Sequence, residues 1–288
     1  MLEMDERLGQ ASPIVVIGMH RSGTRLLVDV LDKLGVFMGA DRQGDGESVS
    51  LMMINEWLFH QCGAFWSEPM SVHFMLSQPE VVDELATSAR QAFGAHLDKY
   101  AGPTRWHLEG GAKQLPAFGW KDPRNTFTLP VWKQVFPNLR AIHIVRHGID
   151  VAASLSQRHL AALLAATGGT APTALAVIRD HAFGILSSRR GWTLTEALTM
   201  WEQYLDKARL ECAALGPRAL EIRYEDLLSE PDRIVPIVAE FCGVAAPAGA
   251  ASVTGLERSR AFAFRRDPDL VDFARSARDA LARYGYAA

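Results

Sequence analysis

The chain has 288 residues, of which 48% are hydrophobic, and a formal net charge of −3. A chain of this length and composition can bury a large core, which favours one sizeable α/β domain over a disordered or fibrous protein. The charge is too small to give the basic surface of a nucleic-acid-binding protein or of one drawn to acidic membranes. Any anion that the protein binds must therefore be held by a local cluster of cations.

The cysteines and the first residues indicate the compartment. Cys62, Cys212 and Cys242 are far apart and odd in number, which is typical of buried thiols in a reducing compartment. The first residues are acidic and lack the apolar core of a secretory signal, and no stretch of transmembrane length follows. We expect a soluble cytoplasmic protein with no membrane span and no nucleic-acid partner. Residues 1–12 are expected to be frayed, and residues 13–288 to form a single domain with helical insertions.

Apolar runs and helical periodicities alternate along the chain. The apolar runs predict strands at 14–17, 141–145 and 219–224. Helical spacing predicts helices at 26–34, 51–60, 79–100, 149–166, 194–215, 231–242 and 270–284. The polar run 39–50 is interpreted as a loop over the site. Alternating strands and helices imply a parallel sheet flanked by helices on both faces, which is a three-layer α/β fold.

The most specific motif lies where the first strand meets the first helix. The apolar run breaks at Gly18, and Arg21-Ser22-Gly23-Thr24 follows where the helix begins. Free N–H groups at a helix N-terminus, together with the helix dipole, suit a phosphate. The glycine spacing is that of G-x-x-x-x-G-K-[ST], but Thr24 occupies the place of the lysine. A surface turn that happens to contain glycine and arginine is the alternative interpretation.

A second motif, Arg146-His-Gly-Ile-Asp-Val-Ala-Ala-Ser154, follows a predicted strand. Ligands of open α/β sheets bind at the carboxyl ends of the strands, so Arg146 and Ser154 are candidates to hold a second phosphate. The alternative is that Arg146 pairs with Asp150 and that Ser154 is hidden in the helix. If the first interpretation holds, Arg146→Ala weakens ligand binding far more than it disturbs folding.

Two further blocks complete the pattern. In Gly119-Trp-Lys121-Asp-Pro-Arg-Asn, the aspartate before proline favours extended structure and directs Lys121 into the site; surface ion pairs are the alternative. In Ile222-Arg-Tyr224-Glu-Asp, an aromatic side chain with a polar tip stands at a strand end, where it can contact a base or serve the core. Glu225 and Asp226 are interpreted as capping or loop-fixing groups.

These four blocks, in the order in which they follow one another along the chain over residues 13 to 243, resemble the sulfotransferase family. The Lys121-Asp-Pro block is more similar to the bacterial and tyrosylprotein branch than to the cytosolic aryl branch. The resemblance implies a P-loop nucleotide-binding-like sulfotransferase fold, with 3′-phosphoadenosine 5′-phosphosulfate as donor and adenosine 3′,5′-bisphosphate as product. It implies that Arg146 and Ser154 hold the 3′-phosphate and that Tyr224 lies near the adenine. The residues implied at the 5′-phosphosulfate are His20, Arg21, Ser22, Gly23, Thr24 and Arg25.

Like phosphoryl transfer, sulfuryl transfer is an in-line displacement that depends on positioning the reactants and stabilising charge, and it needs little covalent catalysis by the protein. Arg21 and Lys121 meet that need. Because the transferred group carries less charge than a phosphoryl group and no carboxylate cluster is evident, we expect no metal. A general base must also reach the acceptor. The resemblance to the tyrosylprotein branch favours Glu47, with His20 beside the Arg21 cation and Glu56 as competitors, and His107 as the analogue of the aryl-branch histidine.

The alternatives to a sulfotransferase are an ATP-dependent small-molecule kinase with a divergent phosphate loop and a non-catalytic nucleotide-binding protein. The acceptor is not defined: a small molecule, a carbohydrate, a lipid or a peptide bearing a hydroxyl or amine all fit. The regions Glu47–Trp66 and Thr167–Gly191 are expected to shape its pocket, and their aromatic residues hint at a partly hydrophobic acceptor. Arg265 is a candidate to lie over the donor, and a homodimer stays open.

Overall fold

The computed structural model describes residues 10–102, 117–166, 189–245 and 257–288. A four-stranded parallel sheet with the order β2-β1-β3-β4 forms the centre. Its strands are β1 (Ile14–Ile17), β2 (Gly119–Lys121), β3 (Arg140–Val145) and β4 (Ala219–Arg223). The apolar runs at 14–17 and 141–145 thus form the two central strands, and the predicted parallel sheet is confirmed. Buried on both faces, such strands need no polar alternation.

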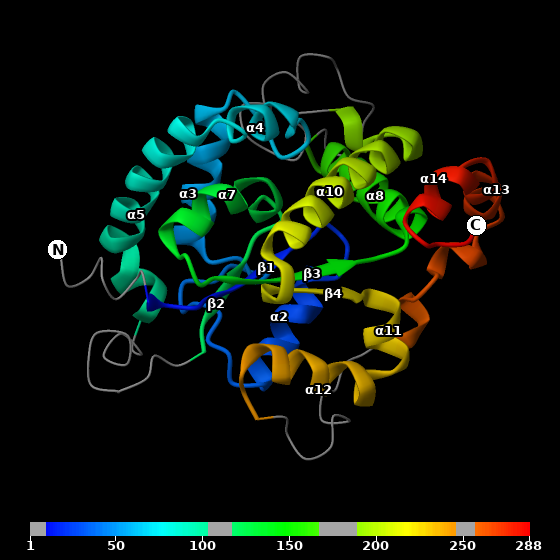
Figure 1. Ribbon diagram of the computed structural model, residues 1–288. Helices are drawn as coiled ribbons and strands as arrows, with labels where there is room; N and C mark the ends of the chain where they lie inside the picture. The colour runs from blue at the N-terminus through cyan, green and yellow to red at the C-terminus, as the bar shows by residue number, and fades with distance from the viewer. Residues whose placement is uncertain (1–9, 103–116, 167–188, 246–256) are drawn as a thin grey trace.

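Helices cover both faces of this sheet (Figure 1). Side chains of β1 alternate: Val15 and Ile17 pack with one layer, Ile14 and Val16 with the other. One layer consists of α3 (Val49–Gln61), α5 (Pro79–Ala101), α7 (Asn125–Val135), α8 (Gly148–Ala166) and α10 (Leu194–Leu215), with α4 (Met70–Met75) beside them. The opposite layer consists of α2 (Thr24–Lys33), α11 (Tyr224–Ser229) and α12 (Pro231–Cys242). The three-layer α/β fold expected from the sequence is therefore confirmed.

Three local features differ from the sequence expectations. Helix α7 was not predicted, and it carries Pro130 within it. Strand β4 ends at Arg223, because Tyr224 already begins α11. The predicted C-terminal helix at 270–284 is two short helices, α13 (Pro268–Ser276) and α14 (Arg278–Arg283), which meet at Ala277.

The C-terminal segment packs beside the carboxyl end of the sheet, where α13 and α14 lie next to α8 (Figure 1). Asp150 of α8 accepts hydrogen bonds from the N–H groups of Ala263 (3.2 Å) and Phe264 (2.8 Å). The ring of His147 stacks on Phe264 with centroids 4.3 Å apart, and its Nε2 lies 2.9 Å from the carbonyl of Ala287. The last described residues are thus fastened close to Arg146.

Candidate active site

The turn between β1 and α2 requires glycine at both of its ends. Gly18 has φ 133°, and a Cβ there would lie 2.5 Å from the carbonyl oxygen of Ile144. Gly23 has φ 93°, and its Cβ would lie 2.2 Å from Cδ2 of Tyr224. L-residues with side chains rarely adopt such backbone angles, so the glycine spacing seen in the sequence has a steric cause. Arg21 between them also has a positive φ, 69°.

The N-terminus of α2 is available to an anion. Gly23 is its N-cap and no side chain caps it. The unpaired N–H groups of the first turn and the positive end of the dipole therefore face the adjoining cleft. Ser22 is fully buried, and its Oγ has no hydrogen-bond partner among the residues described. A buried hydroxyl without a partner is costly, so the turn suits a phosphate or a sulfonate.

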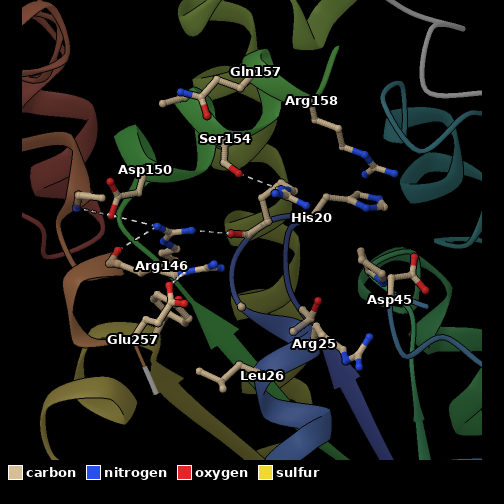
Figure 2. Close-up of a pocket in the computed structure, with 18 of the residues that line it drawn as sticks. His20, Arg25, Leu26, Asp45, Arg146, Asp150, Ser154, Gln157, Arg158 and Glu257 are labelled. Atoms are coloured by element: carbon tan, nitrogen blue, oxygen red, sulfur yellow. Dashed lines mark hydrogen bonds and ion pairs between the residues drawn. The ribbon is translucent and has the colours of Figure 1, made fainter. Parts of the chain in front are cut away.

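A cleft of about 790 Å³ opens beside this turn (Figure 2). Its walls come from α2, α8, the loop before α3 and the C-terminal segment. The predicted residues that line it are His20, Arg21, Gly23, Thr24, Arg25, Glu47, Lys121, Arg146, Ser154 and Tyr224. Ser22, the remaining predicted residue, is fully buried within the turn and is not among the residues that line the cleft. The four motifs, far apart in the sequence, thus meet at one edge of the sheet.

Arg21 and Ser154 approach one another across the cleft. Nε of Arg21 donates to Oγ of Ser154 at 2.9 Å. In the described part of the chain, no carboxylate pairs with Arg21. Burial, with Arg158 and Arg146 nearby, lowers the pKa of Arg21. This concentration of positive charge favours a bound anion.

Arg146 connects four parts of the site. It donates to the carbonyls of Arg21 (3.3 Å) and Arg260 (3.0 Å), and it lies 3.4 Å from the Asp150 carboxylate. Its guanidinium stands over the ring of Tyr224, 4.7 Å from the centroid. Arg146 therefore faces the cleft and also pairs with Asp150, whereas Ser154 lines the cleft and is not hidden in the helix.

Glu47 and Lys121 form a buried ion pair at the other side of the cleft. Nζ of Lys121 donates to Oε1 of Glu47 at 2.8 Å, and the two residues are only 3% and 6% exposed. The loop that carries Glu47 is held by Arg25, whose guanidinium binds the Gly44 carbonyl. Burial, with the charge of Asp122 added, raises the pKa of Glu47 to about 7 despite Lys121. A carboxylate of that pKa suits general base chemistry near neutral pH.

The competing bases have different surroundings. The ring of His20 packs edge-on against Trp66, with centroids 4.8 Å apart, and its Nε2 has no hydrogen-bond partner among the described residues. Burial, followed by the charges of Arg158, Arg124 and Lys121, lowers the pKa of His20 well below its ordinary value and keeps the ring neutral. The sequence named the neighbouring Arg21, which contributes least of these. Glu56 lies outside the cleft, 3.8 Å from Arg124. His107 lies outside the described residues.

Sequence reasoning missed two cations of the cleft, Arg158 and Arg260. Arg158 follows Ser154 by four residues on α8 and extends toward His20 (Figure 2). The helical spacing of four was the signal that would have found it. Arg260, not Arg265, lines the cleft from the C-terminal segment, whereas Arg265 stacks over Phe262 at 4.4 Å. Arg25 lines the cleft but pairs with Asp29 (3.0 Å) and the Gly44 carbonyl rather than turning to the glycine turn.

Neither metal-binding nor membrane-spanning features are found where the chain is described. Within residues 10–102, 117–166, 189–245 and 257–288, no three His, Cys, Asp or Glu side chains gather as a metal site. No helix of that part combines the length and apolar character that crossing a bilayer requires. Of the regions expected to shape the acceptor pocket, most of Thr167–Gly191 lies outside the described residues.

The fold and the cleft define an α/β protein with a cation-lined cleft at the uncapped N-terminus of the helix that follows its first strand. The model of the sulfotransferase family matches residues 13–248, and the chain belongs to that family. It is an enzyme of the sulfotransferase class, and the reaction of this class is transfer of a sulfuryl group.

Several solved structures are similar to the chain. The sulfotransferase domain of the Synechococcus PCC 7002 olefin synthase is 18% identical with a TM-score of 0.49, and the match covers 92% of this chain and 88% of that one. A sulfotransferase from Alicyclobacillus acidocaldarius is 13% identical with a TM-score of 0.49, covering 92% and 90%. The sulfotransferase domain from the curacin biosynthetic pathway is 16% identical with a TM-score of 0.48, covering 86% and 79%.

Proposed function

We propose that this enzyme transfers the sulfuryl group of 3′-phosphoadenosine 5′-phosphosulfate to a hydroxyl or amine of its acceptor. The observation that carries the proposal is the joint lining of one cleft by an uncapped helix N-terminus, the cations Arg21 and Arg146 with the Ser154 hydroxyl, and the buried Glu47–Lys121 pair. The cations suit a donor with two anionic ends. The carboxylate suits an acceptor that must lose a proton.

The residues of the cleft fit this donor. The unpartnered hydroxyl of Ser22 and the free N–H groups at Gly23 and Thr24 would receive the 5′-phosphosulfate, with His20 and Arg25 at the edge. Arg146 and Ser154 would hold the 3′-phosphate. Tyr224, whose ring packs against Gly23, would lie beside the adenine. When bound, the donor supplies an activated sulfuryl group, so the protein needs no covalent step of its own.

The work of the protein is then to hold charge and to accept one proton. Arg21 would stabilise the negative charge that appears on the departing phosphate oxygen, and Lys121 would neutralise the sulfuryl oxygens. Glu47 would take the proton of the acceptor hydroxyl as the new S–O bond forms. Because burial raises the pKa of Glu47 to about 7, the fraction of ionised base grows as the pH rises through that value. His20, neutral by burial, is the competing acceptor for this proton.

A kinase is less compatible with the same cleft. The lysine that follows the second glycine of a nucleoside-triphosphate loop is replaced by Thr24. Lys121 reaches the cleft from β2 instead, and there it pairs with Glu47. A non-catalytic nucleotide-binding protein would not need a buried carboxylate with a pKa near neutrality beside the anion site.

We also infer that residues 13–288 form a single domain. The C-terminal segment, beyond the residues that the family model matches, binds Asp150 and His147 and lines the same cleft through Arg260 and Phe264. The acceptor would enter near Glu47, where the side chains of Trp66 and Tyr204 stand beside His20. A partly hydrophobic acceptor suits that wall. The similarity to the tyrosylprotein branch stays a prediction.

Isothermal titration calorimetry with adenosine 3′,5′-bisphosphate tests the proposal. It should bind about tenfold or more tightly than adenosine 5′-monophosphate, because only the bisphosphate offers the 3′-phosphate to Arg146 and Ser154, and a hydrogen bond to a charged group contributes about 1.5–3 kcal/mol. ATP with Mg²⁺ is the comparison for a kinase. Equal binding of adenosine 3′,5′-bisphosphate and adenosine 5′-monophosphate, or a preference for ATP with Mg²⁺, would overturn the donor assignment.

A further inference from the structure

Asn55 is a polar residue of the core that does not line the cleft. It lies on α3 and is fully buried. Its Nδ2 donates to Oδ2 of Asp122 at 2.9 Å and to Oδ1 of Asn125 at 2.7 Å. Its Oδ1 accepts from Thr128 Oγ1 and from Trp132 Nε1, both at 2.8 Å. Both hydrogens of the amide and two acceptor positions of its oxygen are thus used, which fixes the orientation of the side chain.

Asp122, which accepts the hydrogen bond from the Asn55 amide, is the residue next to Lys121 of the candidate active site. It follows Lys121 at the end of β2 and is 1% exposed. Besides Asn55, its carboxylate accepts the N–H of Arg124 at 2.9 Å and the Nε of Arg124 at 3.0 Å. All these partners are donors, which suits an ionised carboxylate. A buried charge of this kind needs such a full set of partners.

We propose that Asn55 is a positioning residue of the active site: by holding the Asp122 carboxylate it fixes the end of β2, and so keeps Lys121 directed at Glu47 and a negative charge behind that pair. The inference rests on the proposed function only in giving Glu47 the role of base. Lys121 and Asp122 are consecutive, so a shift of the Asp122 backbone also moves Lys121. Asn55 touches neither the cleft nor Glu47, and it acts through Asp122.

The charges around Glu47 give this arrangement a measurable consequence. Charged and titratable groups from several elements face Glu47. They are Lys121 at the end of β2, Asp122 directly after it, Asp45 from the same loop as Glu47, Arg124 before α7, and Tyr204 from α10. After burial, the charge of Asp122 is the largest cause that raises the pKa of Glu47, and Lys121 opposes it. Weakening the negative charge of Asp122 should therefore lower the pKa of Glu47. A network that only joins α3 to α7 would leave that pKa unchanged.

The test follows the carboxyl carbon of Glu47 by ¹³C NMR across pH in the full chain labelled at glutamate, with Glu47→Gln to identify the signal. Asp122→Asn removes the charge with little change of volume and should lower the pKa of Glu47 by about one unit or more. Asn55→Ala removes the donor that holds Asp122 and so frees both Asp122 and the adjoining Lys121, which act on Glu47 with opposite signs; the pKa of Glu47 should therefore differ from that of the wild type. Asn55→Ser, which keeps a hydroxyl in the core, is carried in parallel in case the alanine variant does not fold.

Thr128→Val is the matched control. It removes the hydroxyl that donates to the Asn55 oxygen at 2.8 Å and contacts the Arg124 carbonyl at 3.3 Å, but leaves the contact between Asn55 and Asp122 in place. It should lower the free energy of unfolding without moving the titration of Glu47. An unchanged Glu47 titration in Asp122→Asn, or a shift in Asp122→Asn with none in either Asn55 variant, would overturn the proposal.

The outcome is separable from the fate of the proposed function, because the titration needs neither donor nor acceptor. Should adenosine 3′,5′-bisphosphate fail to bind the wild-type chain, the donor assignment fails while the Glu47 titration still decides the role of Asn55. If both hold, the Asn55 variants should retain affinity for the bisphosphate. With an acceptor in hand, they should show a lower turnover and an acid limb of the rate profile that moves with the measured pKa of Glu47.

Discussion

Glu47 and Glu225 are both buried acids whose pKa is raised by burial, and their neighbours separate their roles. The carboxylate of Glu225 accepts the N–H of His147 at 2.8 Å and the hydroxyl of Tyr286 at 3.1 Å, so it fixes two backbone segments. Glu47 instead faces the cleft beside Lys121. A raised pKa thus indicates a base only where the group can also reach a substrate.

Arg146→Ala is expected to weaken binding and folding together. Affinity for adenosine 3′,5′-bisphosphate should fall by about ten- to a hundredfold, the usual effect of losing a hydrogen bond to a charged group. From the sequence alone, we expected the loss of binding to be far greater than the effect on folding. In the structure, however, Arg146 also pairs with the buried Asp150 and ties the carbonyls of Arg21 and Arg260. The free energy of unfolding should therefore fall by about 1–3 kcal/mol.

Calorimetry and urea unfolding measure these two effects. Arg42→Ala removes the same charge from an exposed pair with Asp32 outside the cleft, and it should change the affinity by less than about threefold. If both variants lowered the affinity equally, net charge rather than contact with Arg146 would explain the loss.

At the scale of elements, the sequence predicted β1, β3 and the less buried β4, whereas β2 is fully buried but, with three residues, too short to form a recognisable apolar run. The apolar runs of β1 and β3 left no alternative to buried parallel strands. Helix α7 escaped because Pro130 lies inside it, where a proline argues against a helix, and because most of its residues are buried, so few polar residues mark an exposed face. The motifs found Arg21, Arg146 and Ser154 because strand ends converge in any parallel sheet. Asn55 gave no signal, since its partners come from β2 and α7, elements distant in the sequence.

The first turn of α2 allows a comparison of two glycines. Gly23→Ala should cost about 2–4 kcal/mol of unfolding free energy, because it adds a contact with the Tyr224 ring to the strain of a positive φ. Gly35→Ala, at the other end of the helix, has φ 81° with no atom within 4 Å of the added Cβ, so only the strain of about 1–2 kcal/mol applies.

Thermal and urea unfolding of the two variants give the difference directly. Placing Gly23→Ala in a Tyr224→Ala background should reduce its cost to that of Gly35→Ala, because the opposing ring is gone. If the cost of Gly23→Ala were undiminished in that background, Tyr224 would not define the shape of the turn from Gly18 to Thr24, which we call the cradle.

At the scale of the whole molecule, the cleft joins the two ends of the described chain. Arg146 bonds to the cradle through Arg21 and to the C-terminal segment through Arg260, while Asp150 holds Ala263 and Phe264. A ligand that binds at the cradle should therefore also stabilise the C-terminal segment. By mass action, a concentration one hundred times the dissociation constant adds about 2.7 kcal/mol to the stability of the native state.

Hydrogen–deuterium exchange with adenosine 3′,5′-bisphosphate measures how far that stabilisation reaches. Amides of residues 18–27 and of residues 260–287 should both exchange more slowly, because opening of either segment breaks contacts of Arg146. Amides of α5, which pack on α7 and α3 away from the cleft, should change less. In Asp150→Ala the bisphosphate should still protect the cradle but protect residues 260–287 less, since the N–H groups of Ala263 and Phe264 lose their acceptor. Protection confined to the cradle in the wild type would show that the C-terminal segment packs beside the donor site without sharing its energetics.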